Sequence, residues 1–487
     1  MKILSKAQKN ISFWFLLITS FIFFLLRLPS LFEPNWYGDE GIYQVIGIAL
    51  RHGRLLYRDI WDNKPPLLYL LYSLFNSDQF AVRLASLIFG VATIIAFFYL
   101  SKKLFSNNKI IFLTTALFAL LFGLPLLEGN IANAENFMLL PIISAGLLIL
   151  KLIEKKTPNA KYLFFSGVLL SLASLFKIVS LFDFAALFTF VAILNAPKDI
   201  KRISTKEIKV LLPLALGFII PHLATFLFFV LKGDTRPFIQ ASFLQNVGYV
   251  GYGNKFFIPQ GLLIIKLLVL FSFSLFIFLK RFKLSTSSIF VLLWFAFSLF
   301  NAFFAGRPYT HYLLVLLPSF CLLVGLIIQD AKLRKFTALL FLISLFLILK
   351  NFNYYGKTIY YYQNFISFLT NHKSVYSYRI FFDAKTPRDY EIVSFIKSHT
   401  KSSDSIFLWG NNAQVYAMTG KLPPGRYAVA YHITGYKDGI ENTQNGIAKE
   451  KLKFIIVMPG SSQIPFSIAN YKETKEIENV LIYERVF

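Results

Sequence analysis

Long apolar runs recur along this sequence and constrain its fold more than any other feature. Each run approaches the roughly 20 residues that an α-helix needs to cross a bilayer. About eleven runs can be placed, near 11–28, 79–100, 110–127, 137–152, 162–178, 180–196, 210–231, 261–279, 286–305, 311–329 and 336–352. Only 15% of the residues are charged, whereas a soluble protein carries about 25%. The sequence therefore predicts a polytopic α-helical membrane protein.

Basic residues gather in every second loop between these runs. They lie in segments 2–9, 102–109, 151–161, 198–209, 280–283 and 332–335. Cytoplasmic loops carry such an excess of lysine and arginine, so we expect a cytoplasmic amino terminus. An odd number of spans then places the carboxy terminus outside, in a multi-pass protein of the cell membrane. This distribution explains the net charge of +25, and we expect no nucleic-acid partner.

Two details bear on this topology. The stretch SLFKIVSLFDF is interpreted as a short outer turn between two spans, because one long helix there would break the alternation of basic loops. No small-residue cleavage site follows the first span, so we expect an uncleaved anchor.

Cys321 is the single cysteine and lies in a predicted span, which excludes an intrachain disulfide.

Hydropathy divides the chain into two expected domains. Residues 1–352 form a transmembrane module whose first outer loop covers about 29–78, and a later outer loop at 232–260 is rich in glycine and aromatic residues. Beyond residue 353, DYEIVSFIKSH predicts a helix, and SIFLWG, KFIIVMPG and NVLIYERV predict strands separated by turn signals. We therefore expect a small extracytoplasmic α/β domain at 353–487.

Two adjacent carboxylates, Asp39 and Glu40, follow the first span in the stretch NWYGDEGIYQVIGIAL. An ionisable group at membrane depth is costly and marks a candidate functional site, although the pair could also begin a solvated loop. The stretch after Glu40 has helical periodicity and could lie along the membrane surface. Neighbouring helical residues point about 100° apart. We therefore expect one carboxylate to act on a substrate and the other to cap or orient.

Lys64 and Glu135 are the next candidates. In RDIWDNKPPLLYLLY, Pro65 favours an extended Lys64 and Pro66 suits the first turn of a helix, which displays the lysine beside an apolar stretch. Such a lysine suits a phosphate, but a snorkelling lysine at the membrane edge fits equally well. Glu135 begins a span in EGNIANAENF. The helix dipole alone favours a carboxylate there, yet it does not explain the neighbouring asparagines.

Three basic groups lie near the outer ends of spans: Lys177, Arg307 and His311. A lone membrane histidine is usually a packing residue, but three cations on the face that carries three carboxylates favour a polar site. We expect an outward-facing cavity with carboxylates for acid–base chemistry and cations for an anionic lipid head group. Paired carboxylates could also bind a divalent cation. No ligand spacing demands one, so no cofactor is predicted.

Four motifs resemble the GT-C glycosyltransferases that use polyprenyl-phosphate sugars: GDEGIY, WDNKPPLLY, GNIANAEN and RPYTHYLLVLLP. The chain is similar to a bacterial branch related to protein O-mannosyltransferases, aminoarabinose transferases of lipid A and Rgt-type glycosyltransferases. The resemblance covers roughly the first 330 residues. It implies a donor sugar on an undecaprenyl- or dolichyl-like phosphate, attack of an acceptor on the anomeric carbon, and inversion of configuration.

The resemblance also implies roles for the candidate residues. Asp39 matches the catalytic carboxylate, the general base for the acceptor hydroxyl, which Glu40 would support. Lys64 would hold the donor phosphate, and Glu135 matches a second acidic position that would orient the acceptor or the sugar. Assisting contacts to the substrate are expected from Lys177, Arg307 and His311. The sugar is left open, and so is the acceptor, which could be a protein hydroxyl, a lipid head group or a surface glycan.

Two other classes of function compete with this interpretation. A lipid or sugar transporter or flippase tends to have internal repeats and a site near the midplane, whereas here the ionisable residues gather at one face and no repeat is visible. A non-enzymatic scaffold would leave Asp39, Lys64 and Glu135 unexplained. We therefore expect a glycosyltransferase whose partners are a polyprenyl-phosphate sugar donor, the lipid bilayer and an extracytoplasmic acceptor.

Overall fold

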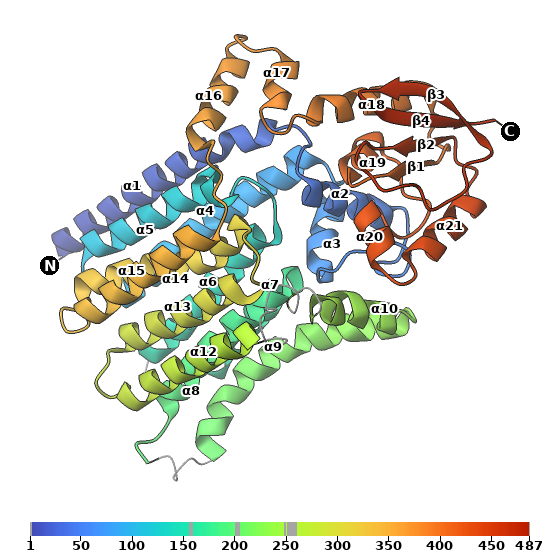
Figure 1. Cartoon of the computed structure of the whole chain (residues 1–487). Helices are drawn as coiled ribbons and strands as arrows, with labels where there is room; N and C mark the ends of the chain where they lie inside the picture. Colours follow the sequence, from blue (N-terminus) through green and yellow to red (C-terminus); the bar gives the residue numbers. More distant parts are fainter. Residues whose placement is uncertain (1, 155–158, 200–204, 248–249, 251–260, 487) are drawn as a thin grey trace. The chain divides into compact units, whose positions relative to one another are not determined.

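The computed structural model describes residues 2–154, 159–199, 205–247, 250 and 261–486 (Figure 1). The chain forms two compact units, each made of several segments. We call them the helical unit (Met1–Leu28, Ala85–Lys232 and Phe243–Thr358) and the mixed unit (Pro29–Leu84, Gly233–Ser242 and Ile359–Phe487). The first outer loop therefore groups with the carboxy-terminal residues, while a domain boundary near residue 353, drawn from hydropathy, stays a prediction. Much of the loop expected at 232–260 lies outside the described residues, as do the basic residues at 155–156 and 201–202.

The helical unit is built from the apolar runs, each of which forms a helix. These helices are α1 (Lys2–Arg27), α4 (Gln79–Leu104), α5 (Asn108–Gly123), α6 (Ala134–Glu154), α7 (Ala160–Phe176), α8 (Leu181–Asn195), α9 (Thr205–Leu231), α12 (Gly261–Lys280), α13 (Thr286–Phe304), α14 (Leu313–Gln329) and α15 (Arg334–Asn351). Within the unit, α14 packs against α5 and α13, and α7 packs against α6 and α9.

The membrane character of the chain follows from these helices. Within the described residues, eight segments are long and apolar enough to cross a bilayer, and α5 and α7 are shorter apolar helices. The chain is thus a polytopic α-helical membrane protein, and the number of eleven spans stays a prediction. The short turn expected in SLFKIVSLFDF is present, because α7 ends at Phe176 and the 3-10 helix η3 (Ile178–Ser180) precedes α8. Lys177 lies between them with extended backbone angles, φ −154° and ψ 124°.

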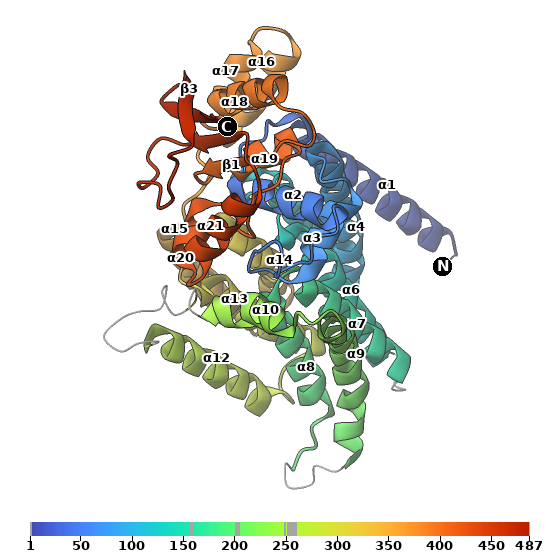
Figure 2. The ribbon, with the colours of Figure 1, turned by 90° about the vertical axis from the view of Figure 1, so that its right-hand side faces the viewer.

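The mixed unit combines the first outer loop with an α/β region. The loop contributes η1 (Leu28–Phe32), α2 (Gly38–Arg51) and α3 (Pro66–Leu74), and α10 (Thr235–Ile239) joins them from the middle of the chain. The carboxy-terminal elements are α16 (Thr358–Leu369), α17 (Val375–Ile380), α18 (Thr386–His399), β1 (Ile406–Trp409), α19 (Ala413–Thr419), α20 (Ala430–Gly435), α21 (Gly439–Lys449), β2 (Phe454–Val457), β3 (Tyr471–Ile477) and β4 (Val480–Arg485). Figure 2 shows α16, α17 and α18 at one end of this unit.

The sheet of the mixed unit has the strand order β1-β2-β4-β3. β1 pairs with β2 in parallel, and β4 pairs antiparallel with both β2 and β3. The predicted helix α18 and the predicted strands β1, β2 and β4 are all present, whereas β3 was not expected. β3 is a charged edge strand with most of its residues exposed, so it lacks the apolar pattern by which buried strands are recognised.

Hydrogen bonds and ring contacts attach the first outer loop to the carboxy-terminal region. The Trp61 amide donates to the Arg426 carbonyl at 2.8 Å, and Arg54 Nη1 donates to the Pro423 carbonyl at 2.9 Å. The Trp61 indole is buried against the rings of Tyr427 and Tyr436. The loop that carries the predicted acidic and basic motifs is therefore held by specific contacts within the mixed unit.

Candidate active site

The first turn of α2 sends the two adjacent carboxylates in different directions. Asp39 remains accessible, with 43% of its side chain exposed, whereas the Glu40 side chain is 5% exposed. This divergence is what helical geometry predicts for consecutive residues. The Tyr43 hydroxyl, one turn further along α2, donates to Asp39 Oδ2 at 3.1 Å. Burial and the nearby Asp39 charge raise the pKa of Tyr43 well above its usual value, so this phenol remains a donor.

Lys64 lies between two carboxylates. Its Nζ is 3.8 Å from Asp39 Oδ2 and 3.7 Å from Asp62 Oδ2, and it also lies 4.7 Å from the centroid of the Tyr43 ring. Pro66 occupies the start of α3, as expected for a proline in a first helical turn. The backbone of Lys64 is fixed on both sides, since its amide donates to the Tyr69 hydroxyl at 3.1 Å and its carbonyl accepts from the Tyr57 hydroxyl at 2.7 Å.

Asp62 connects this lysine to the carboxy-terminal region. Its Oδ2 accepts a hydrogen bond from Tyr69 at 2.7 Å, and its Oδ1 lies 3.9 Å from His432 Nε2 at α20. Burial would raise the pKa of Asp62, but Lys64, His432 and the Tyr69 hydroxyl together hold that pKa below its usual range. Burial lowers the pKa of His432 from 6.5 to about 4. Asp62 is therefore an anion and His432 a neutral imidazole near pH 7.

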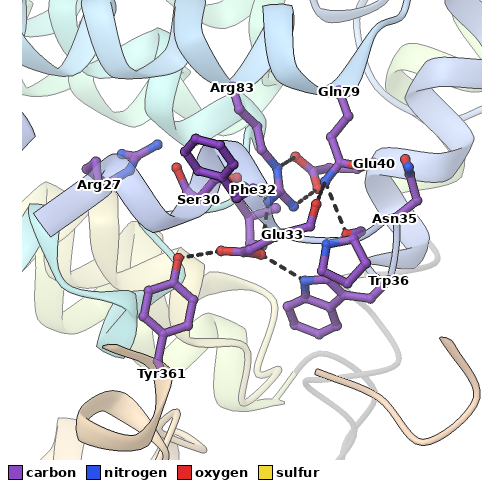
Figure 3. A network of polar contacts seen from close by, with 12 residues as sticks. Arg27, Ser30, Phe32, Glu33, Asn35, Trp36, Glu40, Gln79, Arg83 and Tyr361 are labelled. Carbon is purple, nitrogen blue, oxygen red and sulfur yellow. Dashed lines mark hydrogen bonds and ion pairs between the residues drawn. The ribbon is translucent and has the colours of Figure 1, made fainter. Parts of the chain in front are cut away.

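Glu40 belongs to a buried ion network (Figure 3). Arg83, fully buried near the start of α4, donates through Nε and Nη2 to the two Glu40 oxygens at 3.0 and 2.5 Å. Arg83 Nη1 lies 2.9 Å from Glu33 Oε2, which also accepts from the Trp36 indole at 2.8 Å. Tyr361 of α16 donates to Glu33 Oε1 at 2.6 Å. These bonds fix the base of α2 and occupy both oxygens of Glu40.

A second polar cluster lies within the helical unit. Glu135 in the first turn of α6 forms an ion pair with Lys177, the residue between α7 and η3. The Lys177 ammonium also lies 4.4 Å from the centroid of the Tyr312 ring. The helix break at Lys177 explains this geometry. In a continuous helix, the Lys177 side chain would point in a different direction around the helix axis. Glu135 is buried and Lys177 is partly buried, with 3% and 14% of their side chains exposed.

His311 and Glu128 form a separate contact in the same unit. His311 Nδ1 lies 3.0 Å from Glu128 Oε2, and the Thr310 hydroxyl donates to Glu128 Oε1 at 2.7 Å. Glu128 has a left-handed backbone with φ 57° at the end of η2 (Pro125–Leu127). Arg307 lies half-buried in the segment that follows α13. His311 is thus paired with a carboxylate that the sequence reasoning did not assign.

The structure brings the predicted residues together as two groups. Asp39 and Lys64 meet in the mixed unit, and Glu135 and Lys177 meet in the helical unit. Sequence reasoning did not assign the side chains that hold the first group, namely Asp62, Tyr43, Tyr69, Arg83 and His432. Asp62 had a local signal, since it stands two residues before Lys64, but His432 had none.

Comparison of whole folds identifies the architecture. The apo crystal structure of ArnT from Cupriavidus metallidurans matches this chain with a TM-score of 0.55, over 98% of both chains and at 13% sequence identity. The chain has the GT-C fold. The GT-C resemblance of the four motifs is therefore confirmed at the level of the fold.

Further comparisons found one family model and other solved structures that match parts or most of the chain. Residues 64–224 match the family model of dolichyl-phosphate-mannose-protein mannosyltransferases. ArnT from Cupriavidus metallidurans bound to undecaprenyl phosphate matches at 12% identity and a TM-score of 0.48, over 97% of this chain and 98% of ArnT. Archaeal AglB from Archaeoglobus fulgidus, in complex with an inhibitory peptide and a dolichol-phosphate, matches at 12% identity and a TM-score of 0.49, over 92% of this chain and 69% of AglB. No curated protein sequence matches the chain.

Proposed function

We propose that the protein is an inverting glycosyltransferase that moves a sugar from a polyprenyl-phosphate donor to an extracytoplasmic hydroxyl. The observation that carries the proposal is the pairing of Asp39, an accessible carboxylate, with Lys64 inside one compact unit. The GT-C fold and the mannosyltransferase family match over residues 64–224 support glycosyl transfer in general. Of the similar proteins, ArnT has been solved bound to undecaprenyl phosphate and AglB in complex with a dolichol-phosphate.

The proposed reaction is a single displacement. The acceptor oxygen forms a bond to the anomeric carbon while the bond from that carbon to the donor phosphate breaks. The acceptor proton passes to Asp39, and the bonding electrons leave with the phosphate. Attack opposite the leaving group inverts the configuration. General base catalysis of this kind contributes typically 10²–10⁴-fold to a rate.

Lys64 is the proposed phosphate ligand. Its ammonium lies 3.8 Å from Asp39 Oδ2 and 3.7 Å from Asp62 Oδ2, which places a cation beside the proposed base. Asp62, which is buried and anionic, lies 3.7 Å from the Lys64 ammonium and holds it in position. Lysine suits this role because it is a compact charge with three donors.

The other candidates are given narrower roles. Glu40 is proposed as a positioning residue for α2, because both of its oxygens already bind Arg83. In the helical unit we propose Glu135 and Lys177 as substrate-binding residues for a hydroxyl or a phosphate. Two further residues, Arg307 and His311, are proposed as assisting contacts to an anionic head group. No metal ligand set is required by these roles.

Transfer of radiolabelled sugar from polyprenyl-phosphate donors tests the proposal. Membranes containing wild type, Asp39→Asn and Asp59→Asn are compared at equal protein levels. Asp59 lies in the same loop and pairs with the exposed Arg58, so its variant controls for the loss of a charge. We expect Asp39→Asn to lower the rate by at least about 10²-fold, and Asp59→Asn to stay near wild type.

Two results would contradict the proposal. Equal transfer by wild type and Asp39→Asn would remove Asp39 as the base. If the lipid-linked sugar moved across the bilayer without transfer from any donor, the protein would be a transporter and not a glycosyltransferase. A radiolabelled product that forms only with wild type, and whose anomeric configuration is opposite to that of the donor, would support both the base and the inversion.

A further inference from the structure

The segment that follows α15 has an unusual composition. Residues 352–382 contain 12 aromatic residues among 31, whereas the whole chain is 18% aromatic. No acidic residue lies between Asp330 and Asp383, while Lys357, Lys373 and Arg379 lie within the segment. Tyrosine together with lysine and arginine is typical of chain that lies at a membrane–water interface.

This segment folds as a helical hairpin. Figures 1 and 2 both show α16 and α17 side by side. Phe368 of α16 stacks on Tyr378 of α17 with ring centroids 4.2 Å apart, and Asn364 Nδ2 donates to the Tyr378 carbonyl at 3.3 Å. Phe365 is buried on the same side of α16. The hairpin thus has an inner side on which some of its aromatic residues pack.

The outer side of the hairpin is also apolar. Its large side chains are between 41% and 72% exposed, and they are Ile359, Tyr360, Ile366, Leu369, Val375, Tyr376 and Ile380. In α16, Ile359 and Ile366 are separated by two turns and therefore lie on one face. A soluble surface rarely exposes so many large apolar side chains together, and such a patch marks a protein or membrane contact.

Chain length favours the membrane over a protein partner. α15 is apolar between its basic ends and exposes Leu342 and Phe346, at 59% and 63%. Its last residue, Asn351, precedes the start of α16 by seven residues. Because an extended chain spans at most about 3.5 Å per residue, the hairpin begins within about 25 Å of the end of a predicted span. A surface within that distance of a span can reach the lipid head groups.

Charge favours an anionic lipid surface. Lys373 binds Asn364 and lies over the Phe381 ring, and Arg379 lies 3.5 Å from the centroid of the Tyr390 ring. These partners are neutral and do not offset the charge of either group. Each basic residue near an anionic membrane adds to its attraction, and salt weakens that attraction.

We infer that α16 and α17 form an interfacial hairpin whose exposed apolar face enters the head-group region of an anionic bilayer. Ile359, Ile366 and Tyr376 are the proposed lipid contacts, and Lys357, Lys373 and Arg379 attract the anionic head groups. The hairpin would tie residues 383–487 to the bilayer surface. This inference does not depend on the proposed glycosyl transfer.

Depth-dependent quenching tests the hairpin in the full chain. The buried Cys321 is replaced by alanine, and single cysteines are introduced as Ile359→Cys, Ile366→Cys and Tyr376→Cys. Each is labelled with an environment-sensitive dye, and the protein is placed in vesicles of phosphatidylcholine with or without phosphatidylglycerol. Ser403→Cys, an exposed position before β1, is the matched control. Lipids brominated at different depths serve as quenchers.

We expect blue-shifted emission at the three hairpin positions and quenching by shallow bromines, with neither at residue 403. Phosphatidylglycerol should strengthen the quenching several-fold at low salt, and Lys357→Gln combined with Arg379→Gln should remove that increase. Water-like emission at all hairpin positions would overturn the inference. Blue-shifted emission without lipid quenching would also overturn it, because the face would then be covered by protein. Quenching that is independent of lipid charge would refute the role of the basic residues.

Discussion

Among single changes of charged residues in the described part of the mixed unit, we expect Arg83→Met to be the most destabilising. Arg83 is fully buried and bonds two carboxylates, Glu33 and Glu40, that are themselves buried. Methionine fills a similar volume but leaves both carboxylates without their counter-ion. The effect should therefore come from charge and not from a cavity.

The expected magnitude follows from the number of bonds lost. Removing one partner of a buried ion pair costs about 3–5 kcal/mol. Arg83 serves two carboxylates and also donates to the Ser30 carbonyl at 2.7 Å, so we expect the upper part of that range. For a cooperative unit of this size, 1 kcal/mol corresponds to about 2–4 °C. Arg83→Met should thus lower the unfolding temperature by about 10–20 °C.

Thermal unfolding of the detergent-solubilised protein, followed by tryptophan fluorescence, measures this shift. Arg51→Met is the matched control, because Arg51 is an exposed arginine at the end of α2, and surface changes usually stay within about 0.5 kcal/mol. Combining Arg83→Met with Glu33→Gln and Glu40→Gln should recover much of the loss, since no buried charge is then left unpaired. A single variant that unfolds within about 2 °C of wild type would refute the reasoning.

Two further predictions concern the same unit. The pKa of His432 is about 4 in the folded protein and 6.5 in the unfolded chain, so the unfolded chain takes up the proton first as the pH falls. The free energy of unfolding should therefore not depend on His432 above pH 6.5. It should fall by about 3 kcal/mol as the pH drops to 4. His432→Gln should remove that slope in pH-dependent melting curves, and an unchanged slope would contradict the assignment. A Cβ on Gly41 would lie 2.6 Å from the Gln414 amide nitrogen, whereas one on Gly38 would meet nothing within 4 Å. Gly41→Ala should lower the melting temperature and Gly38→Ala should not, and equal effects would show that the close approach of α2 and α19 does not matter.

The sequence was informative wherever a local pattern carried the structure. Apolar runs of span length predicted the helices of the helical unit, and the strands β1, β2 and β4 followed from short apolar segments. β3 escaped because its exposed residues carry Lys and Glu instead of an alternating apolar pattern. Its turn into β4 uses Glu478 and Asn479 with positive φ angles of 46° and 63°, and this pair is not a common hairpin signal. The hairpin of α16 and α17 escaped because tyrosine and phenylalanine favour strands as much as helices.

The candidate site likewise contains residues that a local sequence pattern marks and residues that only the tertiary fold brings in. Asp39 and Lys64 were found because each interrupts or borders an apolar stretch, where a charge needs an explanation. His432 stands 370 residues after Asp62, and it becomes part of the cluster only through the tertiary fold. Its neighbourhood in the sequence is ordinary. Arg83 was missed for a different reason, because an arginine near the start of a span resembles an interfacial residue, while in the structure it is completely buried.

The motif GDEG at residues 38–41 shows how one short segment can satisfy requirements that act on different sides of a helix. Helical geometry places Asp39 toward Lys64 and Glu40 toward Arg83. Gly41 permits the close approach of α19, so the same turn also contacts the carboxy-terminal region. Asp39, the accessible carboxylate, is thus held in place by its neighbour Glu40. Glu40 cannot itself take part in proton transfer while Arg83 binds both Glu40 oxygens. The proposed base is in this way supported by a buried charge network, and its position need not depend on a substrate.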